Sequence, residues 1–183
     1  MSQVCVLLAA GFEEIEALAP VDLLRRAGAK VSLLSITGEP LVEGAHGIEV
    51  MADSLLISTD LKECKMLILP GGSPGYKNLS ECEKVMEAIE QINVTGGHIA
   101  AICAAPTILG SMGLLKDKKA VCFPGMEDGL HCKSNPNARV VTDGNITTAK
   151  SAGCAVEFGL ELIKILYGEK RSSEITKQIV FKR

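Results

Sequence analysis

The residue best placed for chemistry is Cys103, which follows the apolar run 98–102 and precedes Ala104-Ala105-Pro106. A short, unbroken apolar run is typical of a strand buried on both faces of a parallel sheet. Pro106 suits the first turn of a helix, because its missing N–H breaks no hydrogen bond there. Cys103 is therefore expected between strand and helix, where helix amides favour the thiolate and lower the pKa. The alternative is an inert core cysteine, since free cysteines are among the most buried residues.

Three carboxylic acids, Glu13, Glu14 and Glu16, follow the first apolar run of the chain. At least one of them is expected to point inward over the sheet edge, where burial and neighbouring carboxylates raise the pKa of a carboxyl group. A neutral carboxylic acid there could donate a proton to sulfur. The other two are interpreted as ordinary first-turn acids, and the spacing does not select which one differs.

The pair Gly71-Gly72 follows another apolar run, 65–69. A tight turn alone explains such a pair. Beside Cys103, the amide of Gly72 would join the amide of Ala104 in a site that holds a developing oxyanion or a sulfinate oxygen.

None of the three histidines is placed by sequence to activate Cys103. His98 begins the strand that ends at Cys103, five residues upstream. Because an extended chain rises about 3.3 Å per residue, His98 is too far from the sulfur to activate it and is interpreted as structural. His46 and His131 lie in polar segments, and a solvated role is expected for each.

The hydrophobic pattern predicts the strands and helices that position these residues, and Gly and Pro predict where those elements end. Strands are expected at 3–10, 30–36, 65–69, 98–102 and 120–123, with an irregular hairpin over 41–52 and a second hairpin, 139–142 and 145–148, around Asp143-Gly144. Helices are expected at 13–27, with a kink or break at Pro20, at 80–93, opened by the capping box Ser80-x-x-Glu83, and at 106–112, 153–166 and 172–178. The polar segment 125–137 is expected to be a mobile loop.

Alternating strands and helices with continuous apolar strands predict a doubly wound, mostly parallel α/β sheet. Ligands bind such sheets beyond the carboxyl ends of the strands. The loops 11–16, 71–76 and 103–107 all leave such ends. If their strands are neighbours, the thiol, the carboxyl groups and the glycine turn converge at one place.

Composition narrows the function classes. The 183 residues suit one domain spanning 1–183, and a net charge of -3 with scattered Lys and Arg favours neither nucleic acid nor a membrane as partner. Without a signal peptide or an apolar run of membrane-spanning length, the expected location is the cytoplasm. The seven cysteines contain no Cys-x-x-Cys pair, which predicts free thiols rather than a disulfide framework or a structural zinc site. A metal cluster of Cys122, His131 and Cys132 is the alternative that we do not favour.

Four motifs together resemble the DJ-one/ThiJ/PfpI superfamily, in the branch of the parkinsonism-associated protein and its bacterial YajL-type relatives. The motifs are Gly11-x-Glu13-Glu14-x-Glu16, Leu69-Pro70-Gly71-Gly72, Ala100-Ala101-Ile102-Cys103-Ala104-Ala105-Pro106 and Glu157-Phe158-Gly159-Leu160. The resemblance spans nearly the whole chain and implies a flavodoxin-like sheet, similar to class I glutamine amidotransferases, in a homodimer. It implies that Cys103 is the oxidisable nucleophile, Glu16 its protonated carboxyl partner, and Gly72 and Ala104 the amide donors.

The chain departs from two branches of that superfamily. Ala104 stands where protease-like members have a histidine, which argues against peptidase activity. Phe123 stands where the animal branch has a histidine. YajL-type members also have a phenylalanine at this position. We therefore expect chemistry without imidazole.

The leading function by resemblance is a cytoplasmic stress-response protein whose Cys103 attacks reactive carbonyls such as methylglyoxal. The activity would be that of a glyoxalase (a lyase) or a deglycase (a hydrolase acting on glycated adducts), with no cofactor and no metal. The alternative is a redox sensor or redox-regulated chaperone in which Cys103 is oxidised to sulfenic and sulfinic acid. Whether Cys122 acts as a resolving thiol stays open. A cysteine peptidase or a thiamine-related enzyme is disfavoured.

Overall fold

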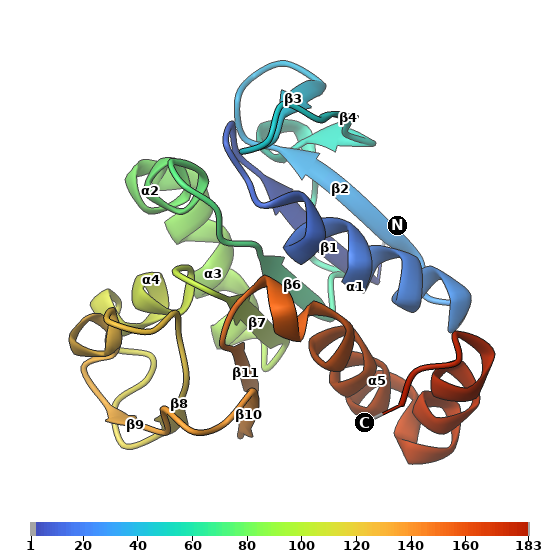
Figure 1. Cartoon of the computed structure of the whole chain (residues 1–183). Coiled ribbons are helices and arrows are strands. Elements are labelled where there is room, and N and C mark those ends of the chain that lie inside the picture. Colours follow the sequence, from blue (N-terminus) through green and yellow to red (C-terminus); the bar gives the residue numbers. More distant parts are fainter. Residues whose placement is uncertain (1–2, 183) are drawn as a thin grey trace.

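A seven-stranded sheet forms the centre of the computed structural model, which describes residues 3–182 (Figure 1). The strand order is β10-β11-β7-β6-β1-β2-β5, and the pairs are parallel except β10 with β11. The strands are β1 (Val4–Leu8), β2 (Val31–Ser35), β5 (Ser54–Leu55), β6 (Met66–Leu69), β7 (His98–Ile102), β10 (Val140–Asp143) and β11 (Ile146–Ala149). This arrangement confirms the predicted α/β sheet.

Helices cover both faces of the sheet (Figure 1). Buried aliphatic residues of α1 and α5 pack on one face, and those of α2, α3 and α4 pack on the other. The bounds are α1 (Glu14–Arg26), α2 (Gly75–Glu81), α3 (Glu83–Val94), α4 (Pro106–Ser111) and α5 (Ala155–Gln178). Alternate residues of the interior strand β1 pack into the two layers: Val4 and Val6 into one, and Cys5 and Leu7 into the other, as the period of a strand requires.

Short elements decorate this frame. The predicted irregular hairpin is present as the antiparallel pair β3 (Leu41–Glu43) and β4 (Glu49–Met51). The Asp143-Gly144 hairpin joins β10 and β11 as predicted. The remaining pieces are β8 (Lys119–Ala120), β9 (Lys133–Ser134), and the short 3-10 helices η1 (Leu56–Ser58), η2 (Glu127–Leu130) and η3 (Ala152–Cys154).

Two expectations about local structure are wrong, and the one at Pro20, a kink or a break, is wrong as to the break. The capping box is absent, because Ser80 lies in the last turn of α2, where its hydroxyl donates to the Lys77 carbonyl at 2.7 Å, and α3 begins after Cys82. Helix α1 runs through Pro20 without a break. The segment 125–137 is not a plain loop, since it contains η2 and β9.

The expected strand 120–123 is also shorter than predicted, because its amides find other partners. The Val121 amide donates to Thr148 Oγ1 at 3.0 Å, and the Phe123 amide donates to the Cys103 carbonyl at 2.7 Å. Only Lys119–Ala120 pairs as a strand, with β9. The segment is thereby fixed against the end of β7, next to the cysteine.

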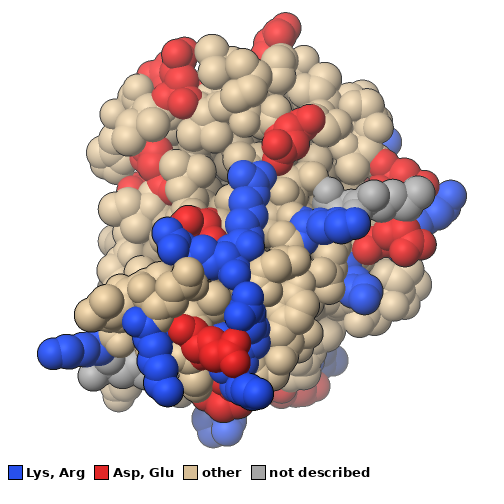
Figure 2. Space-filling view, turned by 90° about the vertical axis from the view of Figure 1, so that its right-hand side faces the viewer, with Lys and Arg blue, Asp and Glu red and all other residues tan. Residues whose placement is uncertain are grey.

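Surface charge is mixed on the face shown in Figure 2, where Lys and Arg lie among Asp and Glu. Over the described residues as a whole, several Lys and Arg side chains form ion pairs, for example Arg26 with Asp22 and Arg171 with Glu174. In the described residues, no helix has both the length and the apolar character needed to cross a membrane.

Candidate active site

Cys103 lies at a sharp turn between β7 and α4. Its φ of 65° is in the left-handed region, which is unusual for a residue other than glycine. Two backbone hydrogen bonds hold it there, because its amide donates to the Ala149 carbonyl at 2.9 Å and its carbonyl accepts from the Phe123 amide at 2.7 Å. Strain of this kind is concentrated at functional sites. The sequence placed the cysteine at this turn but gave no signal of its left-handed backbone.

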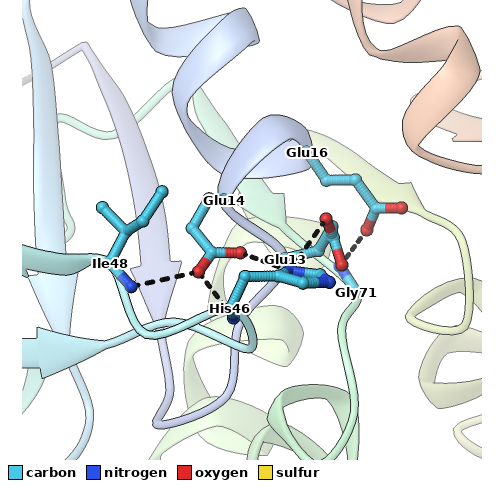
Figure 3. A network of polar contacts seen from close by, with 6 residues as sticks. All are labelled: Glu13, Glu14, Glu16, His46, Ile48 and Gly71. Atoms are coloured by element: carbon cyan, nitrogen blue, oxygen red, sulfur yellow. Dashed lines mark hydrogen bonds and ion pairs between the residues drawn. The ribbon is translucent and has the colours of Figure 1, made fainter.

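Glu16, from the first turns of α1, is the carboxyl group that reaches the sulfur. It is 1% exposed and accepts a hydrogen bond from the Gly71 amide at 2.9 Å (Figure 3). It accepts another hydrogen bond from the Cys103 thiol. Burial raises the pKa of Glu16 to about 7; the charge of Glu13 adds to this, while hydrogen bonds from Cys103, Gly71 and Ala152 oppose it. The expected inward-pointing carboxyl with a raised pKa is therefore Glu16.

The thiol of Cys103 is not the free thiolate that its position before a helix predicted. Burial raises the pKa of Cys103 to about 12, and the charge of Glu16 and the hydrogen bond to it act in the same direction. The amides of Ala104 and Gly72 bond to the sulfur and lower this pKa without offsetting the other effects. The expectation was wrong because it left out the burial of the thiol, which is the largest effect, and the negative charge of Glu16.

Cys103 and Glu16 therefore titrate as a pair. The pair loses its first proton near the pKa of Glu16, about 7. The proton that remains lies mainly on the sulfur, because the pKa of Cys103 is raised to about 12, and the thiol donates it to Glu16 in a hydrogen bond. When it resides on Glu16, the sulfur is a thiolate held by two amides, which is the nucleophilic form.

Both glycines of the Gly71-Gly72 turn are required by close approach. A Cβ on Gly71 would lie 2.6 Å from Glu16 Oε2 and 2.7 Å from Cys103 Cβ. Gly72 has a φ of 93°, which brings its amide to the sulfur. The turn thus places one amide on the carboxyl group and one on the thiol. The predicted donor pair, Gly72 and Ala104, is found at the sulfur.

A cavity of about 260 Å³ opens above the sulfur. Its walls are Glu13, Gly72, Ser73, Tyr76, Cys103, Ala104, Phe123 and Met126. Phe123 occupies this wall while remaining 45% exposed. The cavity combines apolar side chains with a thiol and two amides, as expected of a site for a small, weakly polar molecule.

Glu14 and His46 have roles that the sequence did not indicate. Glu14 is buried, and its Oε1 accepts from the amides of His46 at 2.8 Å and Ile48 at 3.4 Å (Figure 3). His46 Nδ1 lies 3.0 Å from Glu14 Oε2 and 3.6 Å from Glu13 Oε1. Glu14 is thus not an ordinary first-turn acid, and His46 is more than a solvated residue.

The other histidines are remote from this chemistry. His98 is buried with Nε2 2.8 Å from Thr147 Oγ1, and burial lowers its pKa to about 4, in keeping with a structural role. His131 is exposed at the end of η2.

Among residues 3–182, the only group of three side chains with donor atoms suited to a metal ion is Glu13, Glu14 and His46, whose atoms lie within 4.8 Å of one another. Ion pairing between the imidazolium and the two carboxylates accounts for that arrangement. Cys122, buried with its thiol donating to the Phe123 carbonyl at 3.4 Å, does not belong to such a group.

Sequence reasoning missed four contributors to the site. Gly71 was passed over in favour of its neighbour, and Glu13 was considered without being distinguished. Tyr76 and Met126 lie in segments with no motif of their own. The adjacent glycines and the three clustered glutamates were the available signals for the first two.

Comparison with known proteins supports the resemblance. The model of the DJ-1/PfpI family matches residues 2–165. Protein DJ-1 homolog B of Arabidopsis thaliana is 35% identical over 98% of this chain, and the chain spans only 42% and 46% of the Arabidopsis homologs B and A.

Two further relatives match along nearly their whole length. The "Glutathione-independent glyoxalase DJR-1.2" of Caenorhabditis elegans is 31% identical over 91% of this chain and 89% of its own. The structure of oxidized DJ-1 from Toxoplasma gondii superposes with a TM-score of 0.95 and 32% identity, covering 100% of both chains. On the family match, the identity to these relatives and the shared fold, the chain belongs to the DJ-1/PfpI family.

Proposed function

We propose that the protein is a cofactor-independent glyoxalase that converts small α-oxoaldehydes such as methylglyoxal into hydroxy acids. The observation that supports this most is the hydrogen-bonded pair of Cys103 and Glu16, with the amides of Gly72 and Ala104 directed at the same sulfur. A nucleophile, a proton carrier and an oxyanion site are thus combined. The name of the C. elegans relative gives independent support.

The proposed reaction begins with addition of the Cys103 sulfur to the aldehyde carbon. The thiol proton passes through Glu16 to the carbonyl oxygen, and the product is a hemithioacetal whose oxygen accepts hydrogen bonds from the two amides. The Glu16 carboxylate then removes the proton from that carbon and returns it to the neighbouring carbon through an enediol. The result is a thioester of lactic acid. Water hydrolyses the thioester and restores the thiol, so methylglyoxal and one water give lactic acid.

This sequence needs one proton carrier and no imidazole at the sulfur. Glu16, with a pKa of about 7, can both accept and return a proton at neutral pH. Peptide hydrolysis would in addition require a strong acid for the leaving amine, which the site does not supply near Ala104 or Phe123. Glycated adducts of the same carbonyls are the second substrate class, as in a deglycase.

The test is turnover of methylglyoxal by the purified protein, with lactate quantified directly and with buffers free of amines that consume the substrate. Cys103→Ser and Glu16→Leu are expected to lose at least a hundredfold in kcat/KM, about 3 kcal/mol of transition-state stabilisation. Cys82→Ser, which removes a half-buried thiol outside the cavity, is the matched control. Lactate formation that persists in Cys103→Ser would refute the proposal.

The second candidate is a redox sensor that uses the same pair. Glu16 can donate a hydrogen bond to an oxidised sulfur, and the Toxoplasma gondii relative has been described in an oxidized form. The same purified protein distinguishes the candidates. A sensor of this kind would form a Cys103 sulfinic acid with limited peroxide while producing no lactate. A Cys103–Cys122 disulfide as the main product would contradict sulfinic acid formation and show that Cys122 is a resolving thiol.

We propose further that the protein is a cytoplasmic homodimer. Support for the dimer comes from exposed apolar residues on the first turn of α1 and on the β3–β4 hairpin: Ile15, Leu41, Ile48 and Met51. Support for the cytoplasm comes from the cysteines, all seven of which are free thiols, as is typical of a reducing compartment.

A further inference from the structure

The β3–β4 hairpin brings a histidine to the edge of the thiol site. His46 is held between two carboxylates, with Nδ1 3.0 Å from Glu14 Oε2 and 3.6 Å from Glu13 Oε1 (Figure 3). Glu14 also binds the backbone of the hairpin through the amides of His46 and Ile48. The position of the imidazole is therefore fixed even though its side chain is 67% exposed.

The two carboxylates that His46 contacts face different parts of the molecule. The Glu14 carboxylate is directed at the hairpin, where it accepts hydrogen bonds from two hairpin amides. Glu13 lines the cavity above the sulfur, and its side chain is 18% exposed. The Glu13 amide donates to the Gly71 carbonyl at 3.1 Å. This bond attaches Glu13 to the Gly71-Gly72 turn, whose own amides donate to Glu16 and to the sulfur. Glu13 is thus the link between the histidine and the reacting groups.

We propose that His46 is a positioning residue for the active site: through its contact with Glu13 it sets the charge that the Glu16–Cys103 pair faces. The inference rests on the proposed function only where it concerns turnover, because the effect of His46 can be measured on the Cys103 thiol directly, without substrate. It differs from the expectation that no histidine influences the site. The imidazole does not take the reacting proton, and instead compensates the carboxylate beside the groups that do.

The charges around each group define the direction of the effect. Glu13 and Glu14 face His46, and together with the hydrogen bond to Glu14 they raise its pKa. Glu13 and Cys103 face Glu16, and the charge of Glu13 raises the pKa of Glu16. Glu14 is not among the groups that shift Glu16. While His46 is protonated it offsets Glu13, and loss of that proton leaves Glu13 uncompensated beside Glu16.

The experiment measures the rate of Cys103 alkylation by iodoacetamide from about pH 5 to pH 9, in buffer with EDTA to exclude metal binding at the three side chains. Mass spectrometry of the Cys103 peptide isolates this thiol from the other six. His46→Gln keeps a polar side chain without charge and should raise the midpoint by about half to one pH unit, the size expected for one nearby, partly solvated charge. Glu13→Gln should lower it, and His46→Arg should preserve the wild-type midpoint.

The double variant His46→Gln/Glu13→Gln gives the sharpest result. If His46 acts through Glu13, its replacement has no further effect once Glu13 is neutral, and the double variant matches Glu13→Gln. His131→Gln, at an exposed histidine on η2, should match wild type. An unchanged midpoint in His46→Gln, or an equal shift in both backgrounds, would overturn the inference. Since no oxoaldehyde is present, the glyoxalase proposal and this one fail by different measurements. His46→Arg, with its charge retained, keeps the test valid if His46→Gln disturbs the hairpin.

Discussion

At the scale of single residues, the proposed reactivity of Cys103 depends on where one proton resides. Burial favours the neutral form of both the thiol and Glu16, and the two groups share a hydrogen bond. A negative charge near Glu16 favours keeping the proton on the carboxyl group, which leaves the charge on sulfur. The amides of Gly72 and Ala104 then stabilise that charge. The carboxyl group is therefore as important to the thiolate as the helix that follows the cysteine.

Replacement of Glu16 should reveal its proton through stability. The pKa of Glu16 in the folded protein, about 7, lies above its ordinary value of 4.5. The folded state therefore holds this proton more tightly, so its stabilising contribution is fully present below pH 4.5 and is lost as the pH rises to about 7. Relative to Glu16→Gln, the free energy of unfolding of wild type should fall by about 3 kcal/mol over that interval.

Urea unfolding of both proteins at several pH values measures this difference. Glu81→Gln, at an exposed glutamate at the end of α2, serves as the control and should track wild type. A wild-type protein whose stability relative to Glu16→Gln is constant from pH 4.5 to 7 would show that Glu16 is ionised throughout.

At the scale of elements, the sequence was informative where one local rule determined the outcome. Continuous apolar runs identified β1, β6 and β7, and Asp143-Gly144 identified its hairpin. Helix α2 was missed because its seven residues are too few for a hydrophobic period, and Ser80 then resembled the cap of the next helix. The prediction of a strand over 120–123 was wrong because the amides of this segment donate to residues distant in sequence.

Long-range contacts likewise limited prediction of the site. Cys103, Gly72 and Ala104 were indicated because they follow strand ends, whereas Glu16 was selected from the three glutamates only by the family resemblance. Contacts of the β3–β4 hairpin with α1 involve residues 32 positions apart, as in the hydrogen bond that the His46 amide donates to Glu14. No spacing rule reports such a contact.

Glu14 should be the residue that attaches this hairpin to α1. Glu14→Ala removes the acceptor for two amides and leaves them without a partner, which should cost about 2 kcal/mol in unfolding free energy. Hydrogen exchange of the His46 and Ile48 amides should accelerate as the hairpin opens more often. Glu14→Gln keeps one acceptor and should lose less.

Exchange measured by NMR, together with urea unfolding, checks this expectation. The matched control is Glu49→Ala in β4, where the side chain is exposed. Unchanged exchange at Ile48 in Glu14→Ala would mean that the hairpin is held by its own backbone pairing and by the bond from the Ala45 amide to the Phe12 carbonyl at 2.8 Å.

At the scale of the whole molecule, the apolar surface near the hairpin is the feature that the monomer leaves unexplained. We call Ile15, Leu41, Ile48 and Met51 the hairpin patch; each is between 44% and 62% exposed. Leu41 and Met51 are cross-strand partners, and the Ile48 amide bonds to Glu14, the neighbour of Ile15. In a two-fold dimer the same patch is used on both subunits, so four residues become eight.

Ile48→Glu should therefore convert the proposed dimer into a monomer. Burying an isoleucine stabilises by about 1.5–3 kcal/mol, and a two-fold interface loses this twice while gaining two carboxylates in an apolar contact. The dissociation constant should rise at least about a hundredfold, roughly 3 kcal/mol. Analytical ultracentrifugation over a range of concentrations measures this dissociation constant.

Ile57→Glu is the matched control, because Ile57 is a 74% exposed isoleucine on η1, outside the patch. Its replacement should leave the mass of the particle in solution unchanged. An Ile48→Glu protein that sediments as wild type, or a wild-type protein that is monomeric at every concentration, would exclude this patch as the dimer interface. If Ile48→Glu is monomeric and its Cys103 alkylation profile is preserved, each subunit contains a complete thiol site.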